Sequence, residues 1–288
     1  MNTHRIILGD CIEGMKTLPD GCVQTCITSP PYFGLRDYGG GDSEIGQEDT
    51  VEGYVQKMTE VFREVRRILR DDGTLWLNLG DSYMSAKNCA PPPQTQGGQR
   101  GMPSDFVPAN RKDQKGLKTK DLIGIPWRVA FALQADGWYL RQDIIWSKPN
   151  PMPESVEDRC TKSHEYIFLL SKKPKYYYDH EAVKETTVSG GEKKNKRSVW
   201  TVNAKGYKGA HFAVYPENLI EPCVLAGCPK DGTVFDPFTG SGTTAVVALK
   251  NGRNYIGTEL NSEYVKIAEE RIKESVPQTL EEILNEQV

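Results

Sequence analysis

The sequence lacks the features that mark membrane-spanning proteins, exported proteins and proteins with a structural zinc site. No apolar run in its 288 residues approaches the ~20 residues that a helix needs to cross a bilayer. The N-terminus MNTHRIILGD has no apolar core followed by a small-residue cleavage site, so we expect no signal peptide. The 7 cysteines form no Cys-x-x-Cys pair, which favours reduced thiols over a structural metal. We therefore expect a cytoplasmic protein with no membrane partner and no bound metal.

Charge is distributed unevenly along the chain. The formal net charge is -3, which argues against a general affinity for nucleic acid but does not exclude local basic patches. Residues 84–120 carry seven Lys or Arg against two acids, and residues 172–210 carry ten against four. Basic segments on an acidic body suggest that one face meets an anionic partner.

Short apolar segments alternate with segments of helical periodicity. Apolar residues recur at helical spacing from residue 51 to residue 69, and Pro126 is placed as the first residue of another helix. Further helices are expected at 216–226, at 243–251 and from residue 262. The expected strands are 6–8, 23–28, 74–79, 138–146, 166–170, 233–235 and 255–259. This alternation predicts an α/β fold: a Rossmann-like, doubly wound, mostly parallel sheet with helices on both faces.

The first unusual stretch is Thr28-Ser29-Pro30-Pro31-Tyr32, directly after the expected strand 23–28. Proline donates no backbone hydrogen bond, so the two prolines end the strand in a stiff turn. A hydroxyl group precedes the prolines and an aromatic ring follows them. Taken alone, the stretch could be a proline-rich strand exit with no further role.

The second unusual stretch, DPFTGSGTT at 236–244, lies between an expected strand and an expected helix. Glycines there let a ligand approach the backbone, and a helix N-terminus favours an anionic group. Glu259 ends the next strand 23 residues after Asp236, an offset at which an acid can bind ribose hydroxyls. The loop lacks the third glycine of a dinucleotide site and the Gly-Lys-[Ser/Thr] of a P-loop. A nucleoside carrying a carboxylate therefore fits better than one carrying a pyrophosphate, with an ordinary βα turn as the alternative.

Together, the two stretches resemble the amino-group DNA methyltransferases that use S-adenosyl-L-methionine. In that family the first stretch is the catalytic motif, [Asp/Asn/Ser]-Pro-Pro-[Tyr/Phe], and the second binds the methionine part of the cofactor. The catalytic motif comes first here, as in the circularly permuted β subgroup. The resemblance extends from Asp10 to about Ala268, and three further stretches carry it: Gly9-Asp10-Cys11, residues 146–150 with Glu165, and residues 211–216 with Leu219.

The resemblance implies direct in-line transfer of a methyl group to an exocyclic amine of a base flipped out of duplex DNA. Ser29 and the carbonyl of Pro30 would accept the amino protons, Pro31 would help to fix the direction of that carbonyl, and Tyr32 would stack on the base. Phe33 would line the pocket or belong to the core. Glycines 39–41 would let the following loop move or approach DNA.

The resemblance also implies a set of cofactor residues at the carboxyl ends of the strands. Asp10 would lie near the adenine amino group, with a simple turn acid as its alternative, and Glu259 would bind the ribose. The methionine end would be held by Asp236, Phe238, Gly240, Ser241, Gly242, Thr243 and Thr244. Because ligands of doubly wound sheets bind where the winding direction switches, the strands before Ser29 and Asp236 should be neighbours.

The two basic segments are expected to be inserted DNA-recognition segments. Residues 1–83, 121–171 and 211–288 would form the catalytic and cofactor-binding domain, with 84–120 a flexible DNA-contacting loop and 172–210 the target-recognition segment. Tyr176 to Tyr178 would contribute to recognition, and both segments could instead be solvated surface loops. The expected DNA-binding residues are Arg36 and a basic cluster made of Lys193, Lys194, Lys196 and Arg197. The resemblance implies double-stranded DNA as the partner. It also suggests a cognate restriction endonuclease as a second partner and a homodimer as the assembly.

The identity of the target base rests on Ser29. Serine at that motif position is more typical of cytosine-N4 enzymes, whereas adenine-N6 enzymes mostly have Asp or Asn, so we prefer cytosine-N4 and keep adenine-N6 open. A cytosine-C5 enzyme would need a nucleophilic cysteine after a proline, and the Pro222-Cys223 pair falls in an expected helix. An RNA or protein-glutamine methyltransferase and a non-catalytic DNA-binding module remain as alternatives from other classes.

Overall fold

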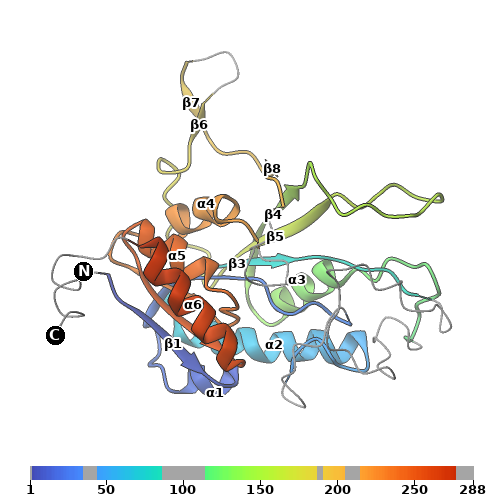
Figure 1. The fold of residues 1–288 in the computed structure, drawn as a ribbon, viewed down its shortest axis with the longest axis horizontal. Coiled ribbons are helices and arrows are strands. Elements are labelled where there is room, and N and C mark those ends of the chain that lie inside the picture. Colours follow the sequence, from blue (N-terminus) through green and yellow to red (C-terminus); the bar gives the residue numbers. More distant parts are fainter. Residues whose placement is uncertain (1, 35–43, 86–113, 187–190, 205–214, 277–288) are drawn as a thin grey trace.

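The central feature of the described residues is an eight-stranded sheet (Figure 1). The computed structural model describes residues 2–34, 44–85, 114–186, 191–204 and 215–276. Within these residues the strand order is β1-β10-β9-β2-β3-β5-β4-β8, and β6 and β7 form a separate two-stranded ribbon. The strands are β1 (His4–Leu8), β2 (Val23–Thr28), β3 (Leu69–Leu79), β4 (Tyr139–Ser147), β5 (His164–Ser171), β6 (Glu185–Thr186), β7 (Lys193–Lys194), β8 (Val199–Thr201), β9 (Thr233–Asp236) and β10 (Asn254–Glu259).

The sheet is parallel over five neighbouring strands and mixed at one end. β1, β10, β9, β2 and β3 pair in parallel, β5 runs antiparallel to both β3 and β4, and β8 is parallel to β4. All six residues of β2 are buried, as expected for a strand covered on both faces. β3 begins at Leu69, five residues before the expected strand 74–79, and its register against β2 shifts between Val23 and Thr25.

Helices cover both faces of the sheet. The helices are α1 (Cys11–Lys16), α2 (Val51–Ile68), α3 (Ile125–Ala135), α4 (Glu217–Gly227), α5 (Thr243–Lys250) and α6 (Ser262–Ser275). One buried cluster holds side chains of α1, α2 and α3, and the other holds side chains of α4, α5 and α6. Alternate residues of β3 enter different clusters: Leu75 and Leu77 belong to the first and Trp76 to the second. The predicted doubly wound α/β fold is therefore confirmed.

Helix α2 illustrates how the sequence produces this packing. The Thr50 hydroxyl accepts a hydrogen bond from the Gly53 amide at 3.0 Å and caps the first turn. Apolar residues then recur every three or four positions, and Tyr54, Met58, Val61, Phe62, Val65 and Ile68 are all fully buried. Among the described residues, no helix combines the length and apolar character needed to cross a membrane.

The described part of the segment 172–210 divides into two structurally different pieces. Tyr178 stacks on Trp76 with ring centroids 6.2 Å apart, and Val183 is buried in the second cluster. β8 joins the main sheet beside β4, whereas the β6–β7 ribbon projects from the body (Figure 1). Tyr178 therefore packs against the sheet, and the ribbon carries the projecting basic residues.

Candidate functional site

The strands that precede the two motifs are neighbours, as predicted. Thr25 and Cys26 of β2 pair with Val234 and Phe235 of β9. The helix after β2 lies on one face of the sheet and the helix after β9 lies on the other. The β2–β9 boundary is therefore the point at which the winding direction switches, and the carboxyl ends of β1, β10, β9 and β2 meet beside it.

Asp236 ties the two motifs together. Its carboxylate is 1% exposed and accepts hydrogen bonds from the Thr28 hydroxyl at 2.6 Å, the Thr244 hydroxyl at 2.6 Å and the Phe238 amide at 2.9 Å. The Tyr215 hydroxyl adds a fourth contact at 3.3 Å. Burial raises the pKa of Asp236 above its usual value, although these hydrogen bonds act in the opposite direction. In this arrangement Asp236 and Thr244 organise the loop from within.

The loop after β9 needs glycine at two positions. Gly240 and Gly242 have φ of +51° and +77°, in the left-handed region that favours glycine. A Cβ on Gly242 would lie 2.9 Å from the Cβ of Ala268, so α6 packs directly on this backbone. A Cβ on Gly240 would meet only the Phe238 carbonyl, at 3.9 Å. Gly242 thus serves close helix packing, whereas Gly240 borders open space.

Arg271 of α6 binds the same loop from the buried side, a role that the sequence did not reveal. Its guanidinium is 7% exposed and donates to the Thr243 hydroxyl at 2.7 Å and to the Ser241 hydroxyl at 3.2 Å. It also forms an ion pair with Glu217 at 3.0 Å. The hydroxyls of Ser241 and Thr243 are therefore directed inward, towards this guanidinium.

Glu259 ends β10, which lies beside β9, and Asp10 follows β1, the next strand out. The Glu259 carboxylate accepts hydrogen bonds from the Gly240 amide at 2.8 Å and the Asn261 amide at 2.9 Å, and burial raises its pKa. Asp10 caps α1, because one of its oxygens accepts from the amides of Ile12 and Glu13 at 2.9 and 3.0 Å. The structure thus gives Asp10 a capping role, and its contact with adenine stays a prediction.

The turn after β2 presents two carbonyls, of which one has a hydrogen-bond donor among the described residues. The Pro31 carbonyl accepts a hydrogen bond from the Tyr54 hydroxyl at 2.9 Å. Within the described residues, no hydrogen bond reaches the carbonyl of Pro30. Phe33 is 2% exposed and its ring contacts Tyr54 at 5.7 Å, so it belongs to the core. The turn is therefore anchored through Pro31 and Phe33, which leaves the Pro30 carbonyl available.

Tyr32 is held by its hydroxyl and by close packing along one edge of its ring. Its hydroxyl contacts Glu165 at 2.7 Å, Asn78 at 3.3 Å and Ser29 at 3.3 Å. Burial raises the pKa of Tyr32 well above its usual value, and the negative charge of Glu165 raises it further. A Cβ on Gly80 would lie 2.7 Å from Tyr32 Cε2, so the missing side chain admits the ring.

The basic cluster lies on and after β7, and part of its charge is already paired. Glu185 of β6 contacts Arg197 at 2.5 Å and Lys194 at 4.0 Å. Lys196 lies over the ring of Trp200, 4.9 Å from its centroid. The predictions for Arg36, for the glycines at 39–41 and for residues 86–113 of the basic loop fall outside the described residues.

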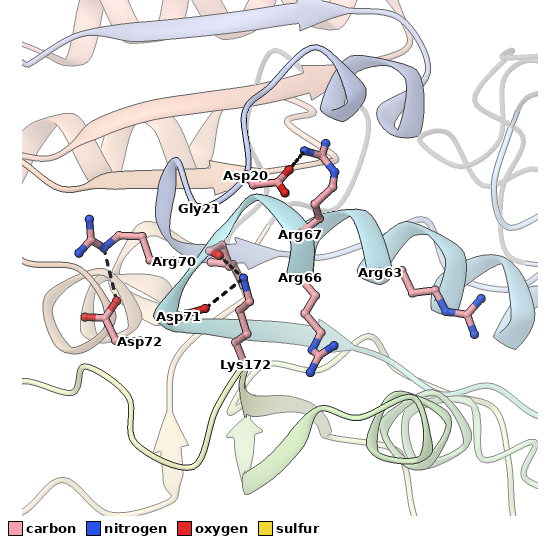
Figure 2. A pocket seen from close by; sticks show the side chains of 10 residues that line it. Asp20, Gly21, Arg63, Arg66, Arg67, Arg70, Asp71, Asp72 and Lys172 are labelled. Carbon is pink, nitrogen blue, oxygen red and sulfur yellow. Dashed lines mark hydrogen bonds and ion pairs between the residues drawn. The ribbon is translucent and has the colours of Figure 1, made fainter.

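A separate cavity of about 770 Å³ lies at the opposite ends of the strands (Figure 2). Its lining includes Gly21 before β2 and Lys172 after β5. Most of its cations are already engaged: Arg63 with Asp136 at 2.6 Å, and Arg67 with Asp20 at 2.7 Å. This cavity therefore lies apart from both motifs and has little unpaired charge to offer a ligand.

Comparison with known proteins agrees with this geometry. A family model described as DNA methylase (N6_N4_Mtase) matches residues 23–270. The type II methyltransferase M.Cfr9I of Citrobacter freundii is 51% identical over 95% of this chain and 89% of its own length. The chain therefore spans most of that relative.

Two solved structures share the fold. One is PvuII DNA methyltransferase (cytosine-N4-specific), with a TM-score of 0.69 at 21% identity over 94% of this chain and 86% of that one. The other is TTHA0409, a putative DNA modification methylase from Thermus thermophilus complexed with S-adenosyl-L-methionine, with a TM-score of 0.64 at 22% identity over 96% of both chains. The resemblance inferred from the two motifs is confirmed, and this chain belongs to the N6/N4 DNA methylase family.

Proposed function

We propose that this DNA methylase transfers a methyl group from S-adenosyl-L-methionine to the exocyclic N4 amine of cytosine in duplex DNA. One observation carries the proposal. The acceptor pair formed by the Ser29 hydroxyl and the Pro30 carbonyl lies next to the glycine loop, because Thr28 and Asp236 are hydrogen-bonded at 2.6 Å. An amine held by the first motif would therefore lie close to a ligand held by the second.

The residues around the loop fit a nucleoside that carries an amino acid. A Cβ on Gly9 would meet no atom within 4 Å, and Gly240 also borders open space, so two backbone positions are open to a ligand. Glu259 offers carboxylate oxygens for ribose hydroxyls, and the N-terminus of α5 suits a carboxylate. The related fold of TTHA0409 was solved with S-adenosyl-L-methionine. We assign Asp10 to adenine and the loop from Asp236 to Thr244 to the methionine end.

When bound, S-adenosyl-L-methionine supplies an electrophilic methyl group on a sulfonium. The chain's own task is to make a poor nucleophile reactive, because the lone pair of an exocyclic amine is delocalised into the ring. The Ser29 hydroxyl and the Pro30 carbonyl would each accept a hydrogen bond from one amino proton, which favours the pyramidal nitrogen of the transition state, and the methylated amine then loses one proton to water. Tyr32 offers a ring on which the extruded base stacks. No nucleophilic side chain is required.

Ser29 is also the residue on which the preference for cytosine over adenine is based. The resemblance associates serine at this position with cytosine-N4 transfer and Asp or Asn with adenine-N6 transfer. We propose duplex DNA as the partner, bound by Arg36, the basic cluster and the loop 84–120 through its phosphates. Residues 172–210 would then contribute target recognition mainly through the β6–β7 ribbon, because Tyr178 is committed to packing against Trp76.

The test is incubation with methyl-tritiated S-adenosyl-L-methionine and mixed-sequence duplex DNA, followed by chromatography of the nucleosides. We expect label on N4-methylcytosine. Label on N6-methyladenine would overturn the choice of base, and label on RNA or protein with none on duplex DNA would overturn the substrate class. Ser29→Ala should lower kcat roughly 100-fold while cofactor affinity is unchanged, since the lost acceptor acts on the transition state.

A further inference from the structure

Glu165 is a charged residue at the catalytic end of the sheet for which the proposed chemistry has no direct use. It lies near the start of β5, which runs antiparallel to β3, and its side chain is 15% exposed. One carboxylate oxygen contacts the Lys148 ammonium. The other accepts from the Tyr32 hydroxyl at 2.7 Å and from the Asn78 amide at 3.2 Å. Three separate elements thus converge on one carboxylate.

These contacts determine the direction of the hydrogen bonds. A carboxylate can only accept hydrogen bonds, so the Lys148, Tyr32 and Asn78 side chains must all donate to Glu165. The Asn78 side chain donates to both Glu165 and the Tyr166 carbonyl, at 3.2 and 3.1 Å, which fixes its amide orientation. Tyr32 has a single hydroxyl proton, and the shortest and most strongly polarised acceptor for it is Glu165. The Tyr32 oxygen is therefore left to accept.

Ser29 is the next group along this chain of contacts. Its hydroxyl oxygen lies 3.3 Å from the Tyr32 oxygen, long for two hydroxyls but usual for catalytic hydrogen bonds before substrate binds. Because the Tyr32 proton points to Glu165, the Ser29 proton can point to Tyr32. Both lone pairs of the Ser29 oxygen are then directed away from Tyr32, where an amino proton of the base can use them.

We infer that Glu165 is a positioning residue: through Tyr32 it orients the Ser29 hydroxyl as a hydrogen-bond acceptor for the target amine. This inference rests on the proposed function, since it assigns the use of the Ser29 lone pairs. Lys148 holds the carboxylate in place, and Gly80 lets the Tyr32 ring reach it, because a Cβ there would lie 3.3 Å from Glu165 Cδ.

The test is Glu165→Gln, which keeps the shape of the side chain. Lys148 requires an acceptor, so the Gln oxygen should face Lys148 and its amide nitrogen should face Tyr32. That nitrogen donates to the Tyr32 oxygen, so the Tyr32 proton turns to Ser29 or to the Asn78 side-chain oxygen, each 3.3 Å away, and the Tyr32 oxygen is no longer free to accept from Ser29. We expect kcat for methyl transfer to fall roughly tenfold or more, with unchanged cofactor affinity by calorimetry and unchanged KM for DNA. Glu64→Gln, in a comparable ion pair with Arg67 at 2.9 Å on α2, is the matched control and should keep the wild-type kcat.

A double-mutant cycle with Tyr32→Phe separates positioning from general support of the fold. If Glu165 acts through the Tyr32 hydroxyl, adding Glu165→Gln to Tyr32→Phe should change kcat by less than about twofold. An equal loss in both backgrounds, a wild-type kcat in Glu165→Gln, or a parallel loss of cofactor affinity would overturn the inference. If Glu165→Gln fails to fold, Glu165→Asp carries the same comparison, because it withdraws the carboxylate from Tyr32 by one methylene. Each variant's kcat is measured relative to wild type on the same DNA. Tritium found on adenine would therefore refute cytosine as the target base, but the comparison of kcat between variants would still test the role of Glu165.

Discussion

Replacing Gly80 by alanine should misplace the turn from Ser29 to Tyr32, which we propose to be the catalytic turn, without disturbing the loop from Asp236 to Thr244, which we propose to bind the cofactor. The added Cβ would lie 2.7 Å from Tyr32 Cε2, whereas two carbon atoms in contact prefer about 3.5–4.0 Å. The ring must therefore move by about 1 Å, and its hydroxyl contact with Glu165 at 2.7 Å resists that movement. Ser29 lies three residues before Tyr32 in the same stiff turn, so its hydroxyl is displaced as well.

A displacement of this size has a large kinetic cost. Misplacing a reacting group by about 1 Å can lower kcat about 100-fold, and overpacking costs about 1–3 kcal/mol of unfolding free energy. Gly80→Ala should show both effects in single-turnover transfer of tritium and in urea unfolding. Its affinity for S-adenosyl-L-methionine, measured by calorimetry, should be unchanged because the glycine loop follows β9 and not β3.

A matched control is Gly53→Ala on α2. Its Cβ would meet the Thr50 hydroxyl at 3.0 Å and the Glu48 Cβ at 3.7 Å, neither of which belongs to the catalytic turn. This variant should keep the wild-type kcat, with a stability change within about 1 kcal/mol. The reasoning is refuted if Gly80→Ala transfers methyl groups at the wild-type rate, or if it loses cofactor affinity as steeply as kcat.

Three further changes test the loop and the DNA surface. Asp236→Asn should reveal the raised pKa of Asp236: the stability that this carboxyl contributes is fully present below its unfolded pKa of about 3.9 and is lost as pH rises through the higher folded pKa. The unfolding free energy of wild type minus that of Asp236→Asn should therefore decrease from pH 4 to pH 7 in urea titrations, and an increase would show that the hydrogen bonds outweigh burial. Arg271→Met should weaken cofactor binding and cost about 1–3 kcal/mol of stability by circular dichroism, because it leaves two buried loop hydroxyls without their donor, whereas Glu217 keeps its ion pair with Lys250 at 2.9 Å; wild-type affinity would exclude a role for Arg271 in shaping the loop. Changing the whole basic cluster to Gln should reduce the salt dependence of DNA binding by roughly two to four in log–log slope, and an unchanged slope would move the DNA contacts elsewhere.

The architecture was largely predictable because it depends on local periodicity and on one topological rule. The apolar run 23–28 is β2 as expected, and Pro126 lies in the first turn of α3. The neighbourhood of β2 and β9 followed from the rule that ligands of doubly wound sheets bind at the switch point. These predictions depend on where strands and helices begin and end and on their order along the chain, and both can be recognised in a single sequence.

The contacts inside the site were less predictable because they depend on strand direction. Glu165 stood out in the sequence only as part of a family stretch, and its meeting with Tyr32 requires β5 to run antiparallel to β3. No periodicity encodes that reversal. Its one visible signal is an acid at the start of an otherwise apolar strand, a position that is costly unless the charge is paired.

The roles of aromatic residues were also hard to predict, because they depend on contacts with residues that are remote in sequence. Tyr178 was assigned to target recognition by its basic surroundings, yet it stacks on Trp76 over the sheet. Phe33 was open between pocket and core, and its burial places it in the core. In both cases the tertiary partner, which is remote in sequence, decides the role of the ring. The DNA-binding assignments for Arg36 and the basic cluster stay predictions.

The hydrogen bond between Thr28 and Asp236 also has a consequence for biosynthesis. It joins residues 208 positions apart, so β2 leaves the ribosome long before its partner β9 is made. At about 5–20 residues per second, that interval is roughly 10–40 s, during which one edge of β2 has no partner strand. The catalytic turn and the glycine loop can be joined only after β9 has emerged. Methyl transfer should therefore begin only after β9 has emerged, and nascent chains stalled before residue 233 should bind no cofactor.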